Sequence, residues 1–338
     1  MKMIKNNFLI ILLSVLVLAS CQNDSIRPNV PIGLYENGYF VTNEGNFGTG
    51  NGSLSFIDDR GSVSNNIFAQ TNSFSLGDVV QSMEIINEKA YIVVNNSSKV
   101  EVANIDSMDY ITTIVGLSSP RYILQVSDNK AYVSDWGIGG LQVIDLNTNS
   151  IISTISTGQG PEKMLIKDNK VFVCNVGGFG LDNTISVIDI NSDMLITNII
   201  VGDKPNSIVE DASGGIWVLA GGNTEYDANW NVIAETPGEL TKINNQTNSV
   251  EESIVFEVGD HPKDLIIDEM GNKLYFSNGS WSKAVYEFDI NNNSVSNNPI
   301  ISKSFYSLAF NNNHIYGTDV KDYVQNGWSY KYNTSGLI

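Results

Sequence analysis

The residues best suited to acid–base or metal chemistry are scarce in this 338-residue chain. His261 and His314 are its two histidines. A histidine-based metal site needs more ligands than this, and a Ser-His-Asp arrangement would depend on His261 alone. Cys174 follows an apolar run over residues 170–173, where a small buried hydrophobe is a better interpretation than a nucleophile. We therefore expect no catalytic residue, no metal site and no bound cofactor.

Motifs for nucleotide or hydrolase chemistry are also missing. The sequence has no G-x-S-x-G and no Walker loop, and the Gly-Gly-x-Gly of residues 177–180 precedes a β-rich run rather than a helix. Paired carboxylates stay open, because Asp and Glu number 37 and a sequence does not show which of them meet in space. A binding protein is therefore favoured over an enzyme, with a propeller lyase or hydrolase as the weaker alternative.

The charge balance narrows the range of partners. The formal net charge is −18 and the isoelectric point is about 4.3. A nucleic-acid partner requires a basic patch, and the sequence shows none, so nucleic acid is excluded. The acidity is typical of a surface that keeps an exported protein in solution.

The N-terminus predicts export and lipid attachment. Lys2 and Lys5 precede an apolar run over residues 8–18, which is too short to span a bilayer but has the length of a signal-peptide core. Small residues and Cys21 follow, and the stretch resembles the bacterial lipobox, whose cysteine is lipidated. We expect a signal peptide over residues 1–20, lipidation at Cys21 and a tether over residues 21–37. A membrane is then a partner through the lipid anchor. Asp24 bears a weak similarity to a surface-export signal, so the expected location is the outer membrane at the cell surface, with periplasmic orientation left open.

A repeated β-rich run predicts the fold. Each copy carries an aromatic or apolar centre after a turn, and copies recur every roughly 40 to 58 residues, near the ~40–45 residues of a four-stranded propeller blade. The seven copies cover residues 38–41, 89–92, 130–133, 170–173, 215–218, 273–276 and 314–317. Alternating strands, Asn-rich turns and Gly-x-x-Pro turns lie between them. We predict an all-β, seven-bladed propeller of four-stranded antiparallel blades over residues 38–338, with six or eight blades as alternatives.

The two ends of the chain do not supply all the strands that closure of a propeller ring usually requires. Ring closure of a propeller removes exposed strand edges, which usually requires both chain ends to share one blade. The first copy has the character of a second strand, and the sequence stops within the seventh unit at Ile338. We therefore expect the last blade to lack a strand, through truncation or an imperfectly closed ring.

Strand order also predicts which face carries function. Loops between second and third strands open on the same face as the links between blades, and here they are long, whereas the opposite turns are short. Long loops on a rigid scaffold are where binding residues concentrate, and aromatic and acidic side chains can stack on or accept hydrogen bonds from a ligand. The candidate ligand-binding residues are Glu44, Phe47, Asp135, Trp136, Phe179, Asp182, Tyr226, Trp230, Trp281, Asp319 and Tyr323. For single residues a structural role competes: Trp136 could pack between blades, and Asp135 and Asp319 could cap turns.

Several of these stretches resemble known propeller families. Residues 132–137 and 187–189, with the Gly-x-x-Pro turns, are similar to the YVTN-type repeat. Residues 175–180, 217–222 and 235–238 resemble the DUF5074-type surface lipoproteins of Bacteroidota, which include cobalamin-capturing propellers. The resemblance implies corrinoid (vitamin B12) capture beside a TonB-dependent outer-membrane transporter. The alternative is a protein–protein interaction scaffold without a small ligand.

Overall fold

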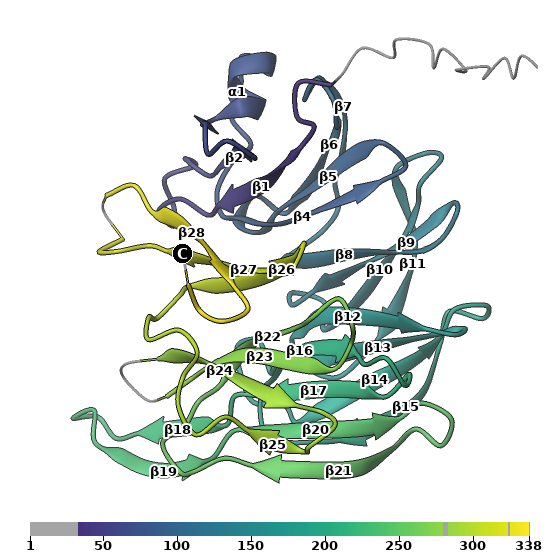
Figure 1. The fold of residues 1–338 in the computed structure, drawn as a ribbon. Helices are drawn as coiled ribbons and strands as arrows, with labels where there is room; N and C mark the ends of the chain where they lie inside the picture. Colours follow the sequence, from purple (N-terminus) through teal and green to yellow (C-terminus); the bar gives the residue numbers. More distant parts are fainter. Residues whose placement is uncertain (1–32, 280–282, 324, 338) are drawn as a thin grey trace, which may run out of the picture.

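Seven antiparallel sheets surround a central axis in the computed structural model, which describes residues 33–279, 283–323 and 325–337 (Figure 1). Each sheet is one blade, and the chain runs through the blades in sequence order. The predicted seven-bladed β-propeller is confirmed. Cys21 and the proposed signal peptide lie outside the described residues.

The five central blades have four strands each. They comprise β4 (Val80–Ile86), β5 (Lys89–Val94), β6 (Lys99–Asn104) and β7 (Tyr110–Ile114); β8 (Pro120–Ser127), β9 (Lys130–Asp135), β10 (Gly140–Asp145) and β11 (Ser150–Ser156); β12 (Pro161–Lys167), β13 (Lys170–Asn175), β14 (Thr184–Asp189) and β15 (Met194–Ile200); β16 (Pro205–Glu210), β17 (Ile216–Ala220), β20 (Glu239–Asn244) and β21 (Ser249–Val255); and β22 (Lys263–Ile267), β23 (Lys273–Asn278), β24 (Ala284–Asp289) and β25 (Ser294–Val295).

The first and last blades have three strands each within the described residues. They are β1 (Gly38–Asn43), β2 (Ser53–Asp58) and β3 (Val63–Ser64), and β26 (Ser307–Asn311), β27 (His314–Asp319) and β28 (Trp328–Asn333). The repeated aromatic run forms the second strand in every other blade, so β1 also stands in the second position. The strand nearest the axis is therefore the one that the described part of blade one lacks, and the predicted three-strand last blade is confirmed. Blades one and seven meet where the Tyr39 hydroxyl lies 3.0 Å from that of Ser329.

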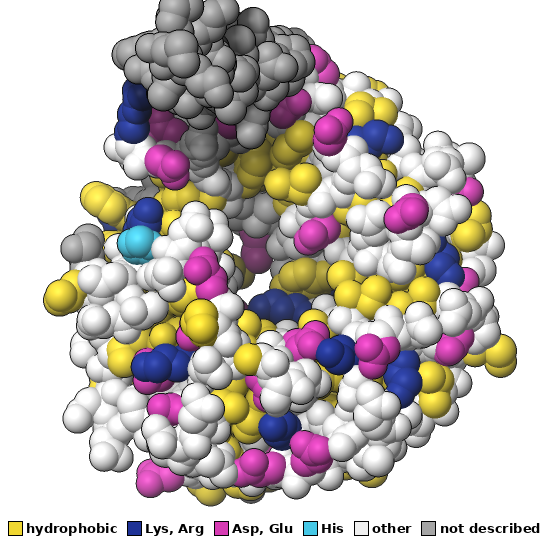
Figure 2. Space-filling model, turned by 45° about the vertical axis from the view of Figure 1, so that its right-hand side comes forward, with side chains coloured by type: hydrophobic (Ala, Val, Ile, Leu, Met, Phe, Trp, Pro, Cys, Tyr) yellow, Lys and Arg dark blue, Asp and Glu magenta, His cyan; other side chains and the backbone are white. Residues whose placement is uncertain are grey.

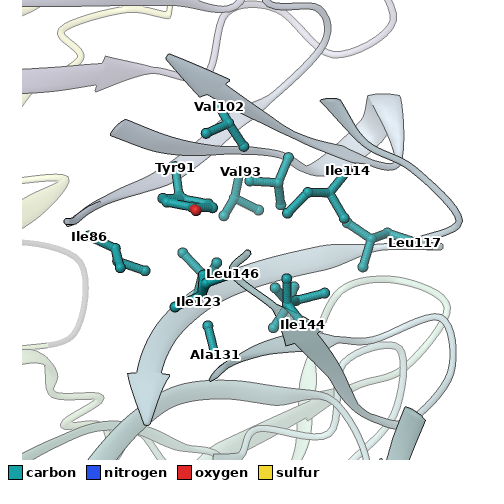
Figure 3. Close-up of a cluster of buried hydrophobic side chains, with 12 residues drawn as sticks. Ile86, Tyr91, Val93, Val102, Ile114, Leu117, Ile123, Ala131, Ile144 and Leu146 are labelled. Carbon is teal, nitrogen blue, oxygen red and sulfur yellow. The ribbon is translucent and has the colours of Figure 1, made fainter. Parts of the chain in front are cut away.

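The repeated aromatic residues form the core between blades. Tyr91, Tyr132, Phe172, Trp217 and Tyr275 occupy equivalent places in second strands and are at most 2% exposed. Second strands are buried on both faces because neighbouring blades pack face to face. Figure 3 shows one such cluster between blades two and three, where side chains of both sheets interleave. Burial of apolar surface between blades stabilises the ring by about 25 cal/mol per Å² removed from water, and this holds one blade to the next.

A recurring cap orders the turn that follows the third-position strand of each blade. The strand ends in Asp or Asn, whose side-chain oxygen accepts hydrogen bonds from backbone N–H groups of the next residues, for example from Arg60 and Ser62 to Asp58 at 2.9 and 2.8 Å. The capping residues are Asp58, Asn104, Asp145, Asp189, Asn244, Asp289 and Asn333. Asx side chains stabilise tight turns in this way, so the Asp or Asn at the end of these strands serves the scaffold.

Three short elements interrupt the blade pattern. A helix, α1 (Ile67–Asn72), links blades one and two and buries Phe68, and a 3-10 turn, η1 (Asn95–Ser97), follows β5. The long insertion in blade five is a hairpin of β18 (Asn223–Tyr226) and β19 (Val232–Thr236), which extends to the left in Figure 1. Across the described ranges, no helix has the length and apolar character needed to cross a membrane.

Candidate functional site

A cavity of about 450 Å³ lies at the mouth of the central channel on the long-loop face. Its wall combines the starts of the inner strands of blades three to six with the loops that precede β10, β14, β18 and β24. The main lining residues are Tyr122, Trp136, Glu162, Lys163, Gly178, Lys204, Asn206, Gly222, His261, Lys263, Asp264 and Lys283. The predicted platform around the channel therefore coincides with a concave site that four blades build together. In Figure 2 a hollow enters one face of the molecule, with a dark blue basic side chain in it.

Close backbone contact shapes one side of this cavity. Gly160 has φ +60° and precedes β12, and Gly178 has φ +56° in the loop after β13. A Cβ on Gly160 would lie 2.0 Å from the backbone nitrogen of Gly178, and a Cβ on Gly178 would lie 3.4 Å from the Trp136 ring. Glycine at both positions lets the two loops meet beside Trp136.

The lining is basic, although the whole chain is strongly acidic. Four lysines, Lys163, Lys204, Lys263 and Lys283, face two carboxylates, Glu162 and Asp264. Both carboxylates are already neutralised by cations. Glu162, 7% exposed, accepts from Arg121 at 2.9 Å, and Asp264 lies 3.4 Å from the ammonium of Lys263.

The remaining lysines form no ion pair with a carboxylate among the described residues. Lys163 and Lys204 make no side-chain hydrogen bond or ion pair within residues 33–279, 283–323 and 325–337. Lys283 donates to the carbonyl of His261, and no carboxylate in the described part of the chain pairs with it. Burial lowers the pKa of Lys283, and the positive charge of Lys263 lowers it further.

His261 is engaged by both ring nitrogens. Nδ1 lies 2.8 Å from the carbonyl oxygen of Gly221, which can only accept, so Nδ1 carries a proton. Nε2 lies 2.8 Å from a carboxylate oxygen of Glu235 and 3.0 Å from the hydroxyl of Thr224. This ring fastens the β18–β19 hairpin to blade six, which is a structural task for the histidine that the sequence offered as a base.

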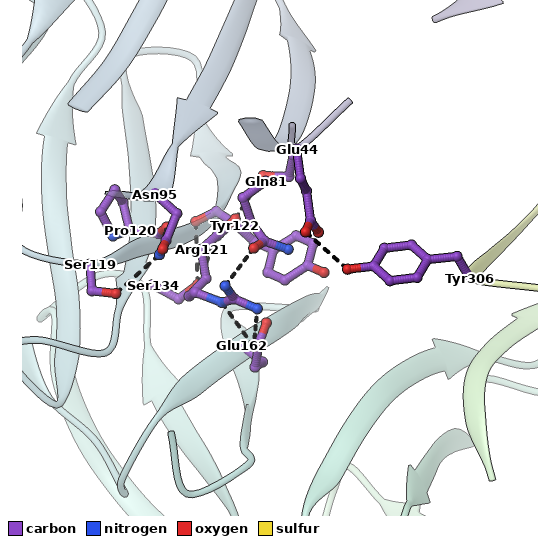
Figure 4. A network of polar contacts seen from close by, with 11 residues as sticks. Glu44, Gln81, Asn95, Ser119, Pro120, Arg121, Tyr122, Ser134, Glu162 and Tyr306 are labelled. Carbon is purple, nitrogen blue, oxygen red and sulfur yellow. Dashed lines mark hydrogen bonds and ion pairs between the residues drawn. The ribbon is translucent and has the colours of Figure 1, made fainter. Parts of the chain in front are cut away.

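A polar network crosses the channel next to the cavity (Figure 4). Arg121 on β8 contacts Gln81 on β4 and Glu162 on β12, so one guanidinium joins three blades. The Tyr306 hydroxyl donates to Glu44 at 2.9 Å and joins blades seven and one. Burial raises the pKa of Tyr122, and its phenol therefore stays neutral in the physiological range.

A second cavity of about 420 Å³ adjoins the first, because Tyr122 and Lys163 line both. Its other walls come from β1, β4 and β26, with Phe40, Met83 and Ala309 among them. It occupies the position beside β1 where the other blades carry their inner strand.

Among the predicted site residues that the structure describes, Trp136 alone lines the main cavity. The Arg121 guanidinium carbon lies 4.2 Å from its ring centre, and the Phe179 ring packs edge-on at 5.7 Å. Phe179 itself is 87% exposed. For the indole N–H of Trp136, which is buried, the described residues provide no acceptor. Trp136 and Phe179 together form an aromatic rim at the cavity mouth.

Two predicted acids hold backbone in place. Asp135 is fully buried and accepts from the N–H groups of Ser118 and Ser119 at 2.8 and 2.7 Å. Asp182 accepts from the N–H of Gln159 at 2.7 Å. Both carboxylates tie the loop after a second strand to the link between blades, so their oxygens are occupied by the scaffold.

The other predicted residues are spread around the loop face. Tyr226 and Trp230 contact each other at 6.0 Å on the hairpin, where Ile233 is also exposed rather than buried between them. Asp319 pairs with Lys303 at 2.8 Å, and Tyr323 packs near Tyr306. Phe47 is 78% exposed. Trp281 lies outside the described residues. The structure does not bring these side chains together with Trp136, and their part in ligand binding stays a prediction.

The lysines of the cavity were missed from the sequence, although a signal was present. A basic residue stands within two positions of the proline at the start of four successive inner strands: Arg121 after Pro120, Lys163 after Pro161, Lys204 before Pro205 and Lys263 after Pro262. Because these prolines open inner strands, the repeat directs basic side chains to one ring around the channel. In the portion of the chain that the structure describes, no three His, Cys, Asp or Glu residues are placed to hold a metal ion.

These features define a seven-bladed β-propeller with a basic cavity at one mouth of its channel. A family model described as a domain of unknown function, DUF5074, matches residues 37–335, and the chain belongs to this family. The resemblance inferred from the sequence is confirmed. No curated protein matches the chain.

Solved structures share the fold at low identity. A quinonprotein alcohol dehydrogenase-like protein of Bacteroides thetaiotaomicron is 14% identical, with a TM-score of 0.64 over 90% of this chain and 74% of the other. The extracellular domain of a protein described as a one component system, from the same organism, is 14% identical with a TM-score of 0.63, over 89% of this chain and 38% of the other. Hydrazine synthase of Kuenenia stuttgartiensis is 14% identical with a TM-score of 0.58, over 69% of this chain and 71% of the other. Proteins with this fold thus include an enzyme and an extracellular domain, and the likeness establishes the fold alone.

Proposed function

We propose that this protein is a non-enzymatic lipoprotein of the outer membrane that captures a small ligand in the cavity at the channel mouth. The observation that carries the proposal is the cavity itself, an open hollow of about 450 Å³ that four blades line on the face with the long loops. Ligand sites are concave, few in number and usually about 300–1,000 Å³ in volume. Trp136 and Phe179 supply an aromatic rim, and backbone groups of residues 176–180 and 221–222 supply polar contacts.

The envelope location rests on the N-terminal sequence. The charged start, apolar run and Cys21 have the pattern of a lipoprotein signal. Among the structural neighbours are extracellular domains from Bacteroides thetaiotaomicron, which fits a propeller that works outside the cytoplasm. A TonB-dependent transporter is the proposed partner, because a captured ligand must cross the outer membrane.

A corrinoid is the first ligand to test, on the strength of the DUF5074 resemblance. We expect the purified protein to bind cyanocobalamin or its precursor cobinamide at submicromolar concentration in a calorimetric titration. Trp136→Ala should weaken this binding at least tenfold, because it removes the ring at the cavity mouth. Tyr110→Ala, which removes a ring from an outer strand of blade two, serves as the matched control. No heat from a folded protein with either corrinoid would reject the corrinoid.

Exposed aromatic side chains favour a second candidate, a platform for a partner protein. Phe47, Phe179, Trp230 and Tyr323 are 78%, 87%, 81% and 67% exposed and belong to four different loops of the same face. Aromatic residues are enriched in protein interfaces. A pull-down that recovers a stoichiometric partner from the cell envelope, with no small molecule added, would favour this candidate over ligand capture.

A further inference from the structure

The distribution of charge in the cavity is opposite to that of the whole molecule. The chain carries 37 acidic residues against 19 lysines and arginines, yet four lysines line this one cavity. A random share of the charged residues would have placed about two acids there for each base. The excess of lysine is local: Lys163, Lys204 and Lys263 stand beside the prolines of inner strands, and Lys283 comes from the loop before β24.

Part of the positive charge in the cavity lacks a close ion-pair partner among the residues described, because Asp260 and Asp264 act on Lys283 without forming an ion pair with it. Glu162 forms an ion pair with Arg121, and Asp264 forms one with Lys263. The ammonium groups of Lys163, Lys204 and Lys283 have no carboxylate partner within the described residues. Lys283 is partly buried, and a buried cation is costly unless an anion pairs with it.

The three lysines approach the cavity from different sides. Lys163 comes from the inner strand β12, Lys204 from the link that precedes β16, and Lys283 from the residue before β24. Lys283 is held by its hydrogen bond to the carbonyl of His261, and that residue is fixed in turn by Gly221 and Glu235. Cations from three blades around one space match a ligand with several negative groups better than a single monovalent ion.

We infer that the cavity binds a small polyanion, meaning a ligand that presents two or more carboxylate or phosphate groups to Lys163, Lys204 and Lys283. The inference rests on the proposed function, because it names the chemical class of the ligand for the same cavity. Ammonium groups bind carboxylate and phosphate oxygens through charge-assisted hydrogen bonds, which are stronger than neutral ones. The wider acidic surface repels anions in general, so anion binding is expected only where lysines gather at the channel mouth.

Calorimetric titration of the purified protein with pyrophosphate and, separately, with citrate tests this inference. The two probes distinguish phosphate from carboxylate chemistry. We expect at least one probe to bind, with an affinity that falls as the salt concentration rises. Lys163→Met, Lys204→Met and Lys283→Met should each weaken that binding about tenfold or more, because each removes a charge-assisted hydrogen bond.

Lys89→Met provides the matched control. Lys89 begins β5 on the face with the short turns, so the substitution changes the net charge equally but leaves the cavity intact. It should leave the affinity for the probe unchanged. Circular dichroism spectra that match the wild type would show that all four variants are folded.

Two results would overturn the inference. One is the absence of heat with both probes from a protein that binds cyanocobalamin, which would keep the proposed capture function and reject the anionic class. The other is probe binding that Lys89→Met weakens as much as the cavity variants do, because binding would then reflect net charge alone. If polyanions bind as expected and corrinoids do not, the cavity is a ligand site and only the corrinoid proposal fails.

Discussion

The carboxylate of Glu162 accepts a hydrogen bond from Nε of Arg121 at 2.9 Å and forms an ion pair with Nη2 at 2.9 Å, inside the channel. This pair joins β8 to β12 across the boundary between blades three and four. Burial raises the pKa of Glu162, and the positive charge of Arg121 acts against that rise. The same guanidinium lies over the Trp136 ring at the cavity mouth. One ion pair thus connects the scaffold of the channel to the candidate site.

Arg121→Met should destabilise the protein by about 3–5 kcal/mol, because it leaves the Glu162 carboxylate buried without a cation. The loss should be smaller at pH 5 than at pH 8, since lower pH lets the buried carboxyl take up a proton. Urea unfolding at both pH values measures it. The double variant Arg121→Met, Glu162→Met should recover part of the loss. A single variant as stable as the wild type would show that the pair contributes nothing to the scaffold.

The turn caps predict a defined acid sensitivity. Hydrogen bonds from the Ser192 N–H and hydroxyl hold the pKa of Asp189 below its usual value, and turn N–H groups act similarly on Asp58 and Asp289. The stability that these carboxylates contribute is present above the unfolded pKa of about 3.9 and is lost as pH falls through the lower folded pKa. The free energy of unfolding should therefore decline below about pH 4.

Asp189→Asn tests this cap directly, because Asn104 and Asn244 occupy the equivalent positions of blades two and five. The variant should keep near wild-type stability at pH 7, since the amide oxygen can still accept from Ser192. Its stability should fall less than that of the wild type between pH 4 and pH 2. Thermal unfolding across this range provides the measurement. An unchanged acid profile would mean that Asp189 does not contribute to it.

Gly160→Ala should disrupt the cavity wall. The new methyl would lie 2.0 Å from the backbone nitrogen of Gly178, so one of the two loops beside Trp136 must move. Gly139→Ala is the matched control, because Gly139 has φ +59° and nothing lies within 4 Å of its Cβ position. The control should lose only the ~1–2 kcal/mol of the left-handed backbone. Gly160→Ala should lose more and should also weaken ligand binding. Equal losses in urea unfolding would contradict the close approach.

Polyanion binding should weaken as the pH is raised, earlier than an ordinary lysine would allow. Burial and Lys263 lower the pKa of Lys283, whereas Asp260 and Asp264 act to raise it. Only the protonated ammonium attracts an anion, so affinity is present below the lowered pKa and is lost as pH rises through it. Citrate titrations between pH 7 and pH 10 measure the effect, because citrate changes its charge less than pyrophosphate does over this range. Lys283→Met should bind more weakly at pH 7 and change less with pH. A wild-type affinity that is flat over this range would exclude a role for Lys283.

The fold could be predicted from the sequence because its cause is local and repeated. The aromatic of each second strand, such as Tyr132 or Trp217, marks the packing between blades, and each Asp or Asn cap marks a turn. Seven copies of one supersecondary unit leave little freedom in the architecture. The long loops could be assigned to one face for the same reason, since strand order alone decides on which face each loop lies.

The site was harder to predict because it depends on which side chains from different blades meet at the same cavity. The sequence suggests Asp135 and Asp182 as ligand-binding acids, and in the fold their carboxylates accept hydrogen bonds from backbone N–H groups of a link distant in sequence. Lys163, Lys204 and Lys283 are ordinary in sequence and become a group only when three blades meet around the channel. A pattern read along one strand does not show which cations lack a partner.

Hydrogen–deuterium exchange of the purified protein, with and without saturating cyanocobalamin, tests most directly whether ligand capture takes place in the channel-mouth cavity. Protection should appear in peptides that cover residues 176–180, 221–222 and 261–264, and not in the short turns of the opposite face, such as residues 127–130. The same footprint should form with pyrophosphate if the polyanion inference holds. Protection confined to the opposite face or to outer strands, with the cavity peptides unchanged, would contradict the account.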